Sequence, residues 1–260
     1  IRHRQQRMAA YLEEQRHITS ETGVDLPETA PPVACREYDA QGRVTALYHR
    51  QGGRLEGPGT WYNEAGQVVQ QACFKHGQLH GEMRRFANNG CLIQRCHFAA
   101  GKLEGAAFFY TDGQLQACMA FRDGRRDGES LLYDEQGQLR EHSFYKDGAR
   151  AGEATYYGIN GQPVKRATYC ANRLHGTTTL YHENGMVRES ADYQDNRLHG
   201  DVITYAPDGT IVARQRFKDG KPVDDPRYAT TPEPGKPKAG STPPEPSWWQ
   251  RLWSRLLEGA

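Results

Sequence analysis

The sequence lacks long apolar runs and has little hydrophobic content overall. Only 37% of its 260 residues are hydrophobic, which is too few for a thick globular core. No stretch approaches the roughly 18 to 20 apolar residues that a membrane-spanning helix requires. Because the chain begins with Ile1 rather than methionine, we expect that an upstream segment was cut away, with a signal peptide and a membrane anchor among the alternatives.

The sequence also has no excess of charge of one sign. Lysine and arginine total 33 and aspartate and glutamate total 32, so the formal net charge is +1. A chain without a bulk electrostatic field has no general means of gathering nucleic acid or acidic substrates. We therefore expect no nucleic acid among its partners.

Glycine is abundant, and 21 of its 28 copies fall on a grid with a step of 24 residues and a single step of 23. The first series is Gly42, Gly66, Gly90, Gly113, Gly137, Gly161, Gly185 and Gly209. The second series is Gly57, Gly81, Gly105, Gly128, Gly152, Gly176 and Gly200. The third series is Gly53, Gly77, Gly101, Gly124, Gly148 and Gly220, with Asn172 and Asn196 at the two missing places. The chain is therefore an array of eight repeated units.

Two of the glycine series predict turns. Asparagine tolerates a positive φ angle best after glycine, so the third series marks left-handed positions in tight hairpin turns such as KDGK and QDNR. The first series closes longer polar turns such as YDEQGQL. Each unit is thus predicted to contain two turns and two strands.

Within the predicted strands, apolar and aromatic residues recur at fixed distances from the first-series glycines. Apolar residues lie two positions on, from Val44 to Ile211, and aromatic residues lie eight positions on, from Phe74 to Phe217. Because both offsets are even, we predict that these columns share one face of the sheet. A further aromatic column precedes most of the same glycines by four residues, beginning at Tyr38 and Tyr62.

The repeated unit, seen as GQLHGEMRRFANNGCL at 77 to 92 and NRLHGTTTLYHENGMV at 172 to 187, resembles the MORN repeat, specifically the bacterial variant of YwqK-type antitoxin proteins. The resemblance covers residues 38 to 222. It implies an elongated, twisted ribbon of antiparallel hairpins that acts in protein or lipid contact, membrane association or toxin neutralisation. Arg50 replaces an aromatic residue, and Arg126 and Arg150 replace leucine, so we expect these arginines to interrupt the apolar surface.

The two ends of the chain differ from the array. Residues 1–34 form a predicted helical arm that caps the first hairpin, follows a membrane anchor or mediates dimerisation. Residues 35–222 form the array, and residues 223–246 form a linker rich in proline. Residues 247–260 are predicted to form an amphipathic helix with tryptophan and leucine on one face. This helix docks on the sheet of the same chain, on a partner protein or on a membrane.

Reactive side chains give no catalytic pattern. The six cysteines do not follow the repeat, and Cys96 is predicted to lie on the opposite face from Cys73 and Cys118, so we expect no disulfide framework. Free thiols favour a reducing compartment, here the cytoplasm, with membrane, periplasmic or envelope locations as alternatives. The segment CLIQRCH lacks a second ligand pair for zinc. His80, His175 and His199 share a repeat position with acids and an alanine, which predicts a solvated position.

We therefore expect an all-β, elongated, single-layer antiparallel sheet of about eight hairpins with short terminal helices. The predicted function is non-enzymatic protein binding without cofactor or metal. Its most specific form is an antitoxin or immunity protein, and the alternative is a membrane-associated scaffold. The candidate partner-binding residues are Trp61, Tyr62, Tyr110, Tyr133, Tyr157, Tyr181, Tyr205, Trp248, Trp249, Leu252, Trp253, Leu256 and Leu257.

Overall fold

The computed structural model of the chain describes residues 30–223. This range contains the predicted repeat array. Residues 1–29 of the predicted N-terminal helical arm, the C-terminal tryptophan helix, and all of the predicted linker except Val223 lie outside the described residues. The last residues of the arm, Val33 and Ala34, belong to strand β1 rather than to a helix.

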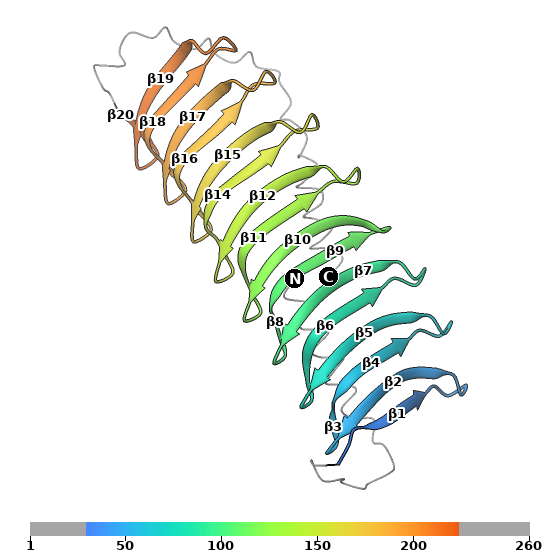
Figure 1. The fold of residues 1–260 in the computed structure, drawn as a ribbon. Helices are drawn as coiled ribbons and strands as arrows, with labels where there is room; N and C mark the ends of the chain where they lie inside the picture. Colours follow the sequence, from blue (N-terminus) through green and yellow to red (C-terminus); the bar gives the residue numbers. More distant parts are fainter. Residues whose placement is uncertain (1–29, 224–260) are drawn as a thin grey trace. The chain divides into compact units, whose positions relative to one another are not determined.

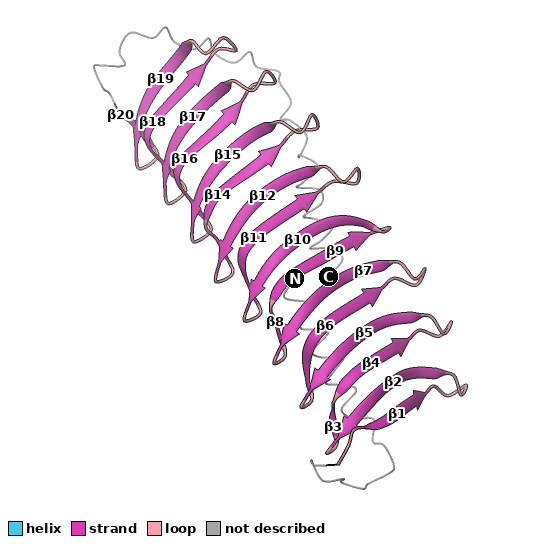
Figure 2. Cartoon of the chain, in the orientation of Figure 1, coloured by secondary structure: helices cyan, strands magenta, loops and turns pink. Residues whose placement is uncertain are grey.

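The described chain is all-β and forms one open antiparallel sheet, as the repeat predicted (Figures 1 and 2). Each strand pairs with its neighbours along the chain, so the sheet is a meander of hairpins. No helix in residues 30–223 is long and apolar enough to cross a membrane. The strands are β1 (Val33–Tyr38), β2 (Val44–Gln51), β3 (Arg54–Leu55), β4 (Gly57–Tyr62), β5 (Val68–Lys75), β6 (Gln78–Phe86), β7 (Leu92–Ala99), β8 (Lys102–Leu103), β9 (Gly105–Thr111), β10 (Gln114–Arg122), β11 (Arg125–Tyr133), β12 (Leu139–Lys146), β13 (Ala149–Arg150), β14 (Gly152–Tyr157), β15 (Pro163–Cys170), β16 (Arg173–Tyr181), β17 (Val187–Gln194), β18 (Arg197–Tyr205), β19 (Ile211–Lys218) and β20 (Lys221–Val223).

The third glycine series forms the predicted tight turns. In the turn between β5 and β6, His76 and Gly77 have φ angles of 50° and 81°, and Lys75 pairs with Gln78. Two central residues with positive φ are typical of a type I′ hairpin turn, whose twist matches that of the flanking strands. Asn172 and Asn196 adopt φ angles of 68° and 67°, so asparagine takes the glycine conformation at the two substituted places.

The tight turns also connect successive units through the backbone. The amide of Gly77 donates a hydrogen bond of 2.8 Å to the carbonyl of Leu55 in the preceding unit. The same bond recurs from Gly101 to Leu79 and from Asn196 to Leu174. Each turn is therefore tied to its predecessor as well as to its own strands.

At the opposite edge, the first glycine series closes five-residue loops held by an acid or amide side chain. Asn63 accepts backbone hydrogen bonds from Ala65 and Gln67 through Oδ1. Asp134 accepts equivalent bonds from Gln136 and Gln138. Such bonds replace the strand ladder locally and favour aspartate or asparagine at the start of the loop.

The single 23-residue step has a local cause. Between β9 and β10, the longer loop is replaced by a two-residue turn in which Asp112 and Gly113 have φ angles of 49° and 80°. Thr111 pairs with Gln114 across this turn. The unit therefore loses one residue without losing its register.

The second glycine series lies at an irregularity inside the strands. Its members have positive φ angles, from 73° at Gly105 to 125° at Gly200. Phe74 and Ala72 of β5 are two residues apart, whereas their partners in β6, Leu79 and Met83, are four residues apart. Two extra residues of β6 therefore lie at Gly81. This bulge bends the strand, and only glycine adopts the required backbone without strain.

Candidate partner-binding face

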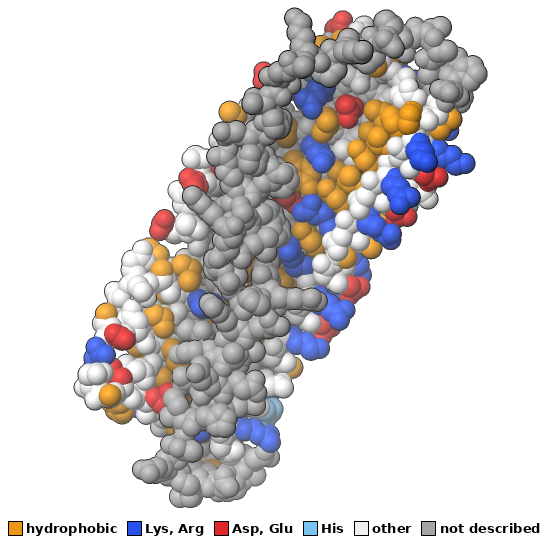
Figure 3. All heavy atoms as spheres, turned by 180° about the vertical axis from the view of Figure 1, so that it is seen from behind, with side chains coloured by type: hydrophobic (Ala, Val, Ile, Leu, Met, Phe, Trp, Pro, Cys, Tyr) orange, Lys and Arg blue, Asp and Glu red, His pale blue; other side chains and the backbone are white. Residues whose placement is uncertain are grey.

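The sheet has two chemically different faces, which we define by their residues. Face A carries Trp61, Ala72 and Phe74, and face B carries Tyr62 and Cys73. Figure 3 shows hydrophobic side chains gathered along the sheet, with lysine and arginine side chains among them. Neighbouring residues of a strand point to opposite sides of the sheet, so the strand register assigns each residue to one of the two faces.

A bulge in the second strand of hairpins such as β4–β5 changes which of the predicted residue columns share a face of the sheet. Trp61 pairs with Gln70, but the next residue, Tyr62, pairs with Val68, so one extra residue lies in β5. The prediction that Val68 and Phe74 share a face is therefore wrong, since the bulge breaks the count of even offsets. The same irregularity recurs in the other units, for example between Leu132 and Tyr133.

The six candidate tyrosines therefore lie on face B. The candidate residue Trp61 lies on face A. All six are half-buried; Tyr110 lies beside the two-residue turn between β9 and β10, and the other five lie beside the longer loops. The Arg166 guanidinium, on face B, stacks on Tyr181 at 6.0 Å from the ring centre. Burial raises the pKa of Tyr133, and the nearby Cys118 and Glu129 of face B raise it further. The candidate residues Trp248, Trp249, Leu252, Trp253, Leu256 and Leu257 lie outside the described residues.

Face A has a central row of small and mostly buried side chains. Ala154 and Ala167 are fully buried and pair directly, and Ser130 pairs with Ser143. The row is covered by larger neighbours. A Cβ atom on Gly59 would lie 2.6 Å from the Trp61 ring, and that ring contacts Phe74 edge-on with centroids 5.8 Å apart. Trp61 therefore lies over a position that only glycine fits.

The first units of face A are apolar. The buried side chains on this part of the face are Ala72, Phe74, Leu79, Met83, Cys96, Phe98, Leu103, Ala107, Ala117 and Phe121. They form a continuous layer of buried apolar side chains on face A. Burial of this kind stabilises the array along the direction in which the units stack.

The following units of face A replace leucine and phenylalanine with arginine and tyrosine. Arg150 donates hydrogen bonds of 2.6 Å to Glu141 Oε1 and to Tyr156 Oη. Its guanidinium also stacks on Tyr145 and Tyr169, at 5.7 and 5.0 Å from the ring centres. Tyr156 and Tyr169 share a further hydroxyl contact of 3.3 Å.

Burial and charge act on this group in opposite directions. Burial alone would lower the pKa of Arg150, but the Glu141 carboxylate and the tyrosines raise it. Burial is also the main cause of the raised pKa of Tyr156, and Glu141 adds to it. Arg150 therefore stays cationic and Tyr156 stays a neutral hydroxyl at physiological pH.

Two further cations join this group by stacking alone. Arg126 lies 4.3 Å from the centre of the Tyr145 ring, and Lys165 Nζ lies 5.5 Å from that of Tyr156. We name Arg126, Glu141, Tyr145, Arg150, Tyr156, Lys165 and Tyr169 the cation–tyrosine cluster. The sequence predicts that Arg126 and Arg150 interrupt the apolar surface. In the structure, the layer of side chains on face A continues through them but changes from apolar to cationic and aromatic, since the stacked guanidinium groups contact the rings directly.

The shared histidine position is solvated at His80 and His175, as predicted, and it also supplies a hydrogen-bond acceptor to the next tight turn. Glu56 accepts a hydrogen bond of 2.7 Å from the amide of His76, the first central residue of the next tight turn. Glu104 accepts one from Asp123, and His199 Nδ1 accepts a longer one of 3.4 Å from Asp219. Acids and imidazole share the position because each offers an acceptor. Residues 30–223 contain no group of three metal-ligating side chains.

The cysteines behave as expected. All six are free. Cys96 is buried on face A, where burial raises its pKa to about 12, whereas Cys73 and Cys118 pair with face B residues. These thiols are strand residues and lie on different faces, as predicted.

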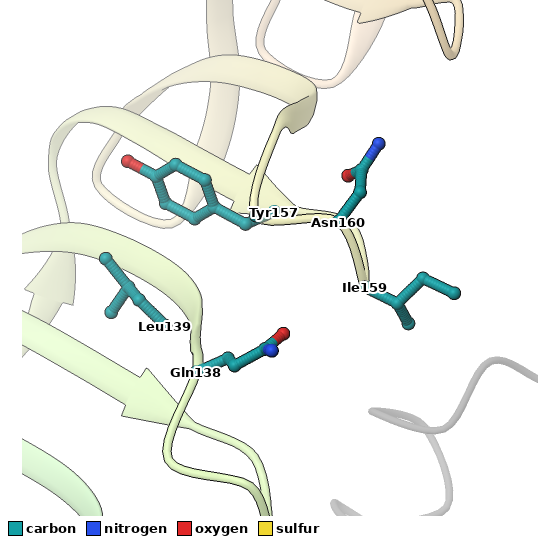
Figure 4. A pocket seen from close by; sticks show the side chains of 6 residues that line it. Gln138, Leu139, Tyr157, Ile159 and Asn160 are labelled. Carbon is teal, nitrogen blue, oxygen red and sulfur yellow. The ribbon is translucent and has the colours of Figure 1, made fainter.

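A shallow depression of about 500 Å³ lies between neighbouring longer loops (Figure 4). Leu139 and Tyr157 line it from successive units, and Ile159, which is 83% exposed, points away from them. Tyr157 is the one titratable residue among those that line it. The depression offers contact surface rather than an acid–base pair.

Comparison with known proteins identifies the repeat. Three units match the MORN repeat variant. The matched residues are 55–76, 126–147 and 174–195, and each segment runs from just after one tight turn to the middle of the next. The match confirms the phase of the MORN-like unit and leaves the antitoxin subgroup untested. No curated protein matches the chain.

Several solved structures contain a similar segment. A chain of the GtfA/B complex bound to UDP and GlcNAc is 19% identical over 45% of this chain and 23% of its own length, with a TM-score of 0.21. S. aureus TarM is 13% identical over 46% of this chain and 19% of its own length, with a TM-score of 0.21. A chain of an accessory secretory protein complex of Streptococcus pneumoniae is 11% identical over 55% of this chain and 23% of its own length, with a TM-score of 0.17. The MORN-like chain spans less than a quarter of these chains, and TM-scores this low say nothing about its activity.

Proposed function

We propose that this chain is a non-enzymatic protein-binding module, and that face A of its sheet is the main contact surface. The observation that carries the proposal is the cation–tyrosine cluster next to the apolar units of face A. Aromatic and arginine side chains are enriched at the centres of protein interfaces. An extended array of repeats presents such side chains over many strands.

The reactive side chains support a non-enzymatic function. A second depression contains Cys35 and His49, the usual types for a nucleophile and a base. However, Cys35 Sγ contacts the carbonyl of Val33 at 3.6 Å, and His49 Nδ1 contacts the carbonyl of Pro58 at 3.2 Å. Both are engaged by backbone rather than by each other.

The most specific form of the proposal is an antitoxin or immunity protein, in the cytoplasm, that covers a toxin. It is supported by the resemblance of the units to those of YwqK-type antitoxin proteins. The alternative is a membrane-associated scaffold that docks through the predicted helix at 247–260. An antitoxin forms a stable complex of defined stoichiometry, whereas a scaffold binds lipid vesicles and loses them when 248–260 is removed.

The test is affinity purification of the full chain from its native host beside the Trp249→Ala/Trp253→Ala variant. Co-purification of one protein in fixed stoichiometry with both chains supports binding through the sheet. Loss from the variant alone assigns recognition to the C-terminal segment. Recovery of no protein with either chain, together with no binding to vesicles, contradicts both forms of the proposal.

A further inference from the structure

The cation–tyrosine cluster carries more positive charge than it neutralises. It contains three cations, Arg126, Arg150 and Lys165, and one carboxylate, that of Glu141. Glu141 is paired with Arg150 at 2.6 Å, with side chains only 12% and 19% exposed. The cluster thus keeps a net charge of about +2 on a face whose central row consists of small, mostly buried side chains.

Arg126 and Lys165 have no ion-pair partner within residues 30–223. Each instead stacks on a tyrosine ring, at 4.3 and 5.5 Å. Some cations elsewhere in the described sheet are paired with carboxylates: Lys146 lies 2.9 Å from Asp127, and Arg214 lies 2.7 Å from Asp201. The nearest further carboxylate on face A, Glu189, is separated from Lys165 by Leu180 of β16.

A buried hydroxyl adds a second, independent observation. Ser143 lies on β12 between Glu141 and Tyr145, on the same face. It is 0% exposed, and its Oγ has no hydrogen-bond partner in the described structure. A buried hydroxyl without a hydrogen-bond partner is energetically unfavourable. A buried hydroxyl without a hydrogen-bond partner thus lies among the groups of the cluster.

We propose that the cation–tyrosine cluster is the recognition site for an acidic peptide segment of the partner protein, one that combines carboxylates with aromatic or aliphatic side chains. This inference rests on the proposed function and names its partner chemistry. Carboxylates pair with Arg126 and Lys165, because guanidinium and ammonium groups held on tyrosine rings lose part of their hydration. Apolar side chains of the same segment pack on the half-buried rings of Tyr145 and Tyr169, since Phe98 and Phe121 in the neighbouring units are buried.

The predicted C-terminal helix of this chain fits the cluster less well. The predicted helix at 247–260 carries Arg251, Arg255 and Glu258, so its own charge is also positive. A separate acidic segment complements the cluster, and like charges repel. We therefore assign the cluster to a partner protein rather than to the predicted helix at 247–260 of the same chain.

The test measures binding of the purified full chain to a fluorescent random copolymer of glutamate and tyrosine. The test variant is Arg126→Gln/Lys165→Gln. The matched control is Arg95→Gln/Arg166→Gln, which removes two cations that also stack on rings, but on face B. We expect saturable binding that the test variant weakens by at least about tenfold, since two charge-assisted contacts are lost, while the control variant stays within twofold.

Several outcomes overturn the inference. Equal loss in both variants indicates non-specific charge attraction, and absence of copolymer binding removes the site. Stronger binding to phosphatidylserine vesicles than to the copolymer, lost in the test variant, assigns the cluster to a membrane. Copolymer binding that appears only after deletion of 224–260 assigns it to the chain's own tail. In each case a partner that still co-purifies leaves the proposed function standing, so the two failures are distinguishable.

Discussion

At the scale of single residues, face A depends on a few positions where one side chain restricts its neighbour. Gly59 has an ordinary φ angle, yet a Cβ there would lie 2.6 Å from the Trp61 ring and 3.3 Å from Tyr48 Cβ. Arg150 satisfies Glu141 and stacks on two tyrosines at once. Such positions permit specific predictions, because each depends on one contact.

Gly59→Ala is expected to destabilise the protein by about 1–3 kcal/mol, the usual cost of overpacking. The Trp61 ring must move away from the central row. The measurement is the urea midpoint of unfolding. In the Trp61→Leu background the same substitution is expected to cost much less, and an equal cost in both backgrounds would contradict the proposed contact.

Arg150→Met is expected to destabilise the protein by about 3–5 kcal/mol, because it leaves the Glu141 carboxylate buried without its partner. The double variant Glu141→Gln/Arg150→Met removes the charge as well and is expected to recover most of the loss. Urea unfolding of the two variants and the parent measures this. A double variant no more stable than Arg150→Met would show that Arg150 acts through stacking rather than through the ion pair.

Asp134 is expected to stabilise the fold at neutral pH and not in acid. Burial alone would raise its pKa, but the amide of Gln138 and the guanidinium of Arg140 lower it below the usual value. A depressed carboxyl pKa stabilises the folded state above the unfolded pKa of about 3.9 and loses that effect as pH falls through the folded pKa. Asp134→Asn is thus predicted to lower the urea midpoint more at pH 7 than at pH 2.5. A pH-independent deficit would contradict the ionic role.

At the scale of elements, the glycine grid predicts both turns of each unit and therefore the hairpins. It does not predict the faces, because a bulge of one residue in β5, between Val68 and Gln70, reverses the count and leaves no residue type that reveals it. The second glycine series did carry a usable signal. Glycine recurs there without any turn residues beside it, which favours a positive φ angle inside a strand.

The two asparagine turns offer a test of this element. Asn172 Oδ1 accepts a hydrogen bond of 2.7 Å from the amide of Arg150 in the preceding unit, which glycine cannot do. Asn172→Gly keeps the backbone angle and is expected to cost about 0.5–1.5 kcal/mol for the lost bond. Asn172→Ala is expected to cost about 1–2 kcal/mol more, because alanine is strained in the left-handed conformation. Thermal unfolding compares the variants, and equal stability of both with the parent would contradict the role.

At the scale of the whole molecule, the repeat determines the array, and the departures from the repeat determine where it differs chemically along its length. Leu79 and Leu103 belong to apolar units, whereas Arg126 and Arg150 belong to the cation–tyrosine cluster. The sequence shows these substitutions but not the stacking on Tyr145 and Tyr169, which depends on the register of the strands in successive units. The predicted tryptophan helix stays a prediction, because it lies outside the described residues.

The most direct test of the central claim, that face A contacts the partner, is site-specific photo-crosslinking in the native host. A benzophenone amino acid is placed at Leu180 or Tyr193 on face A, and at Phe144 or Val164 on face B. The account predicts that one partner protein is crosslinked from both face A positions and from neither face B position. Crosslinking from Phe144 and Val164, with none from Leu180 and Tyr193, would contradict it.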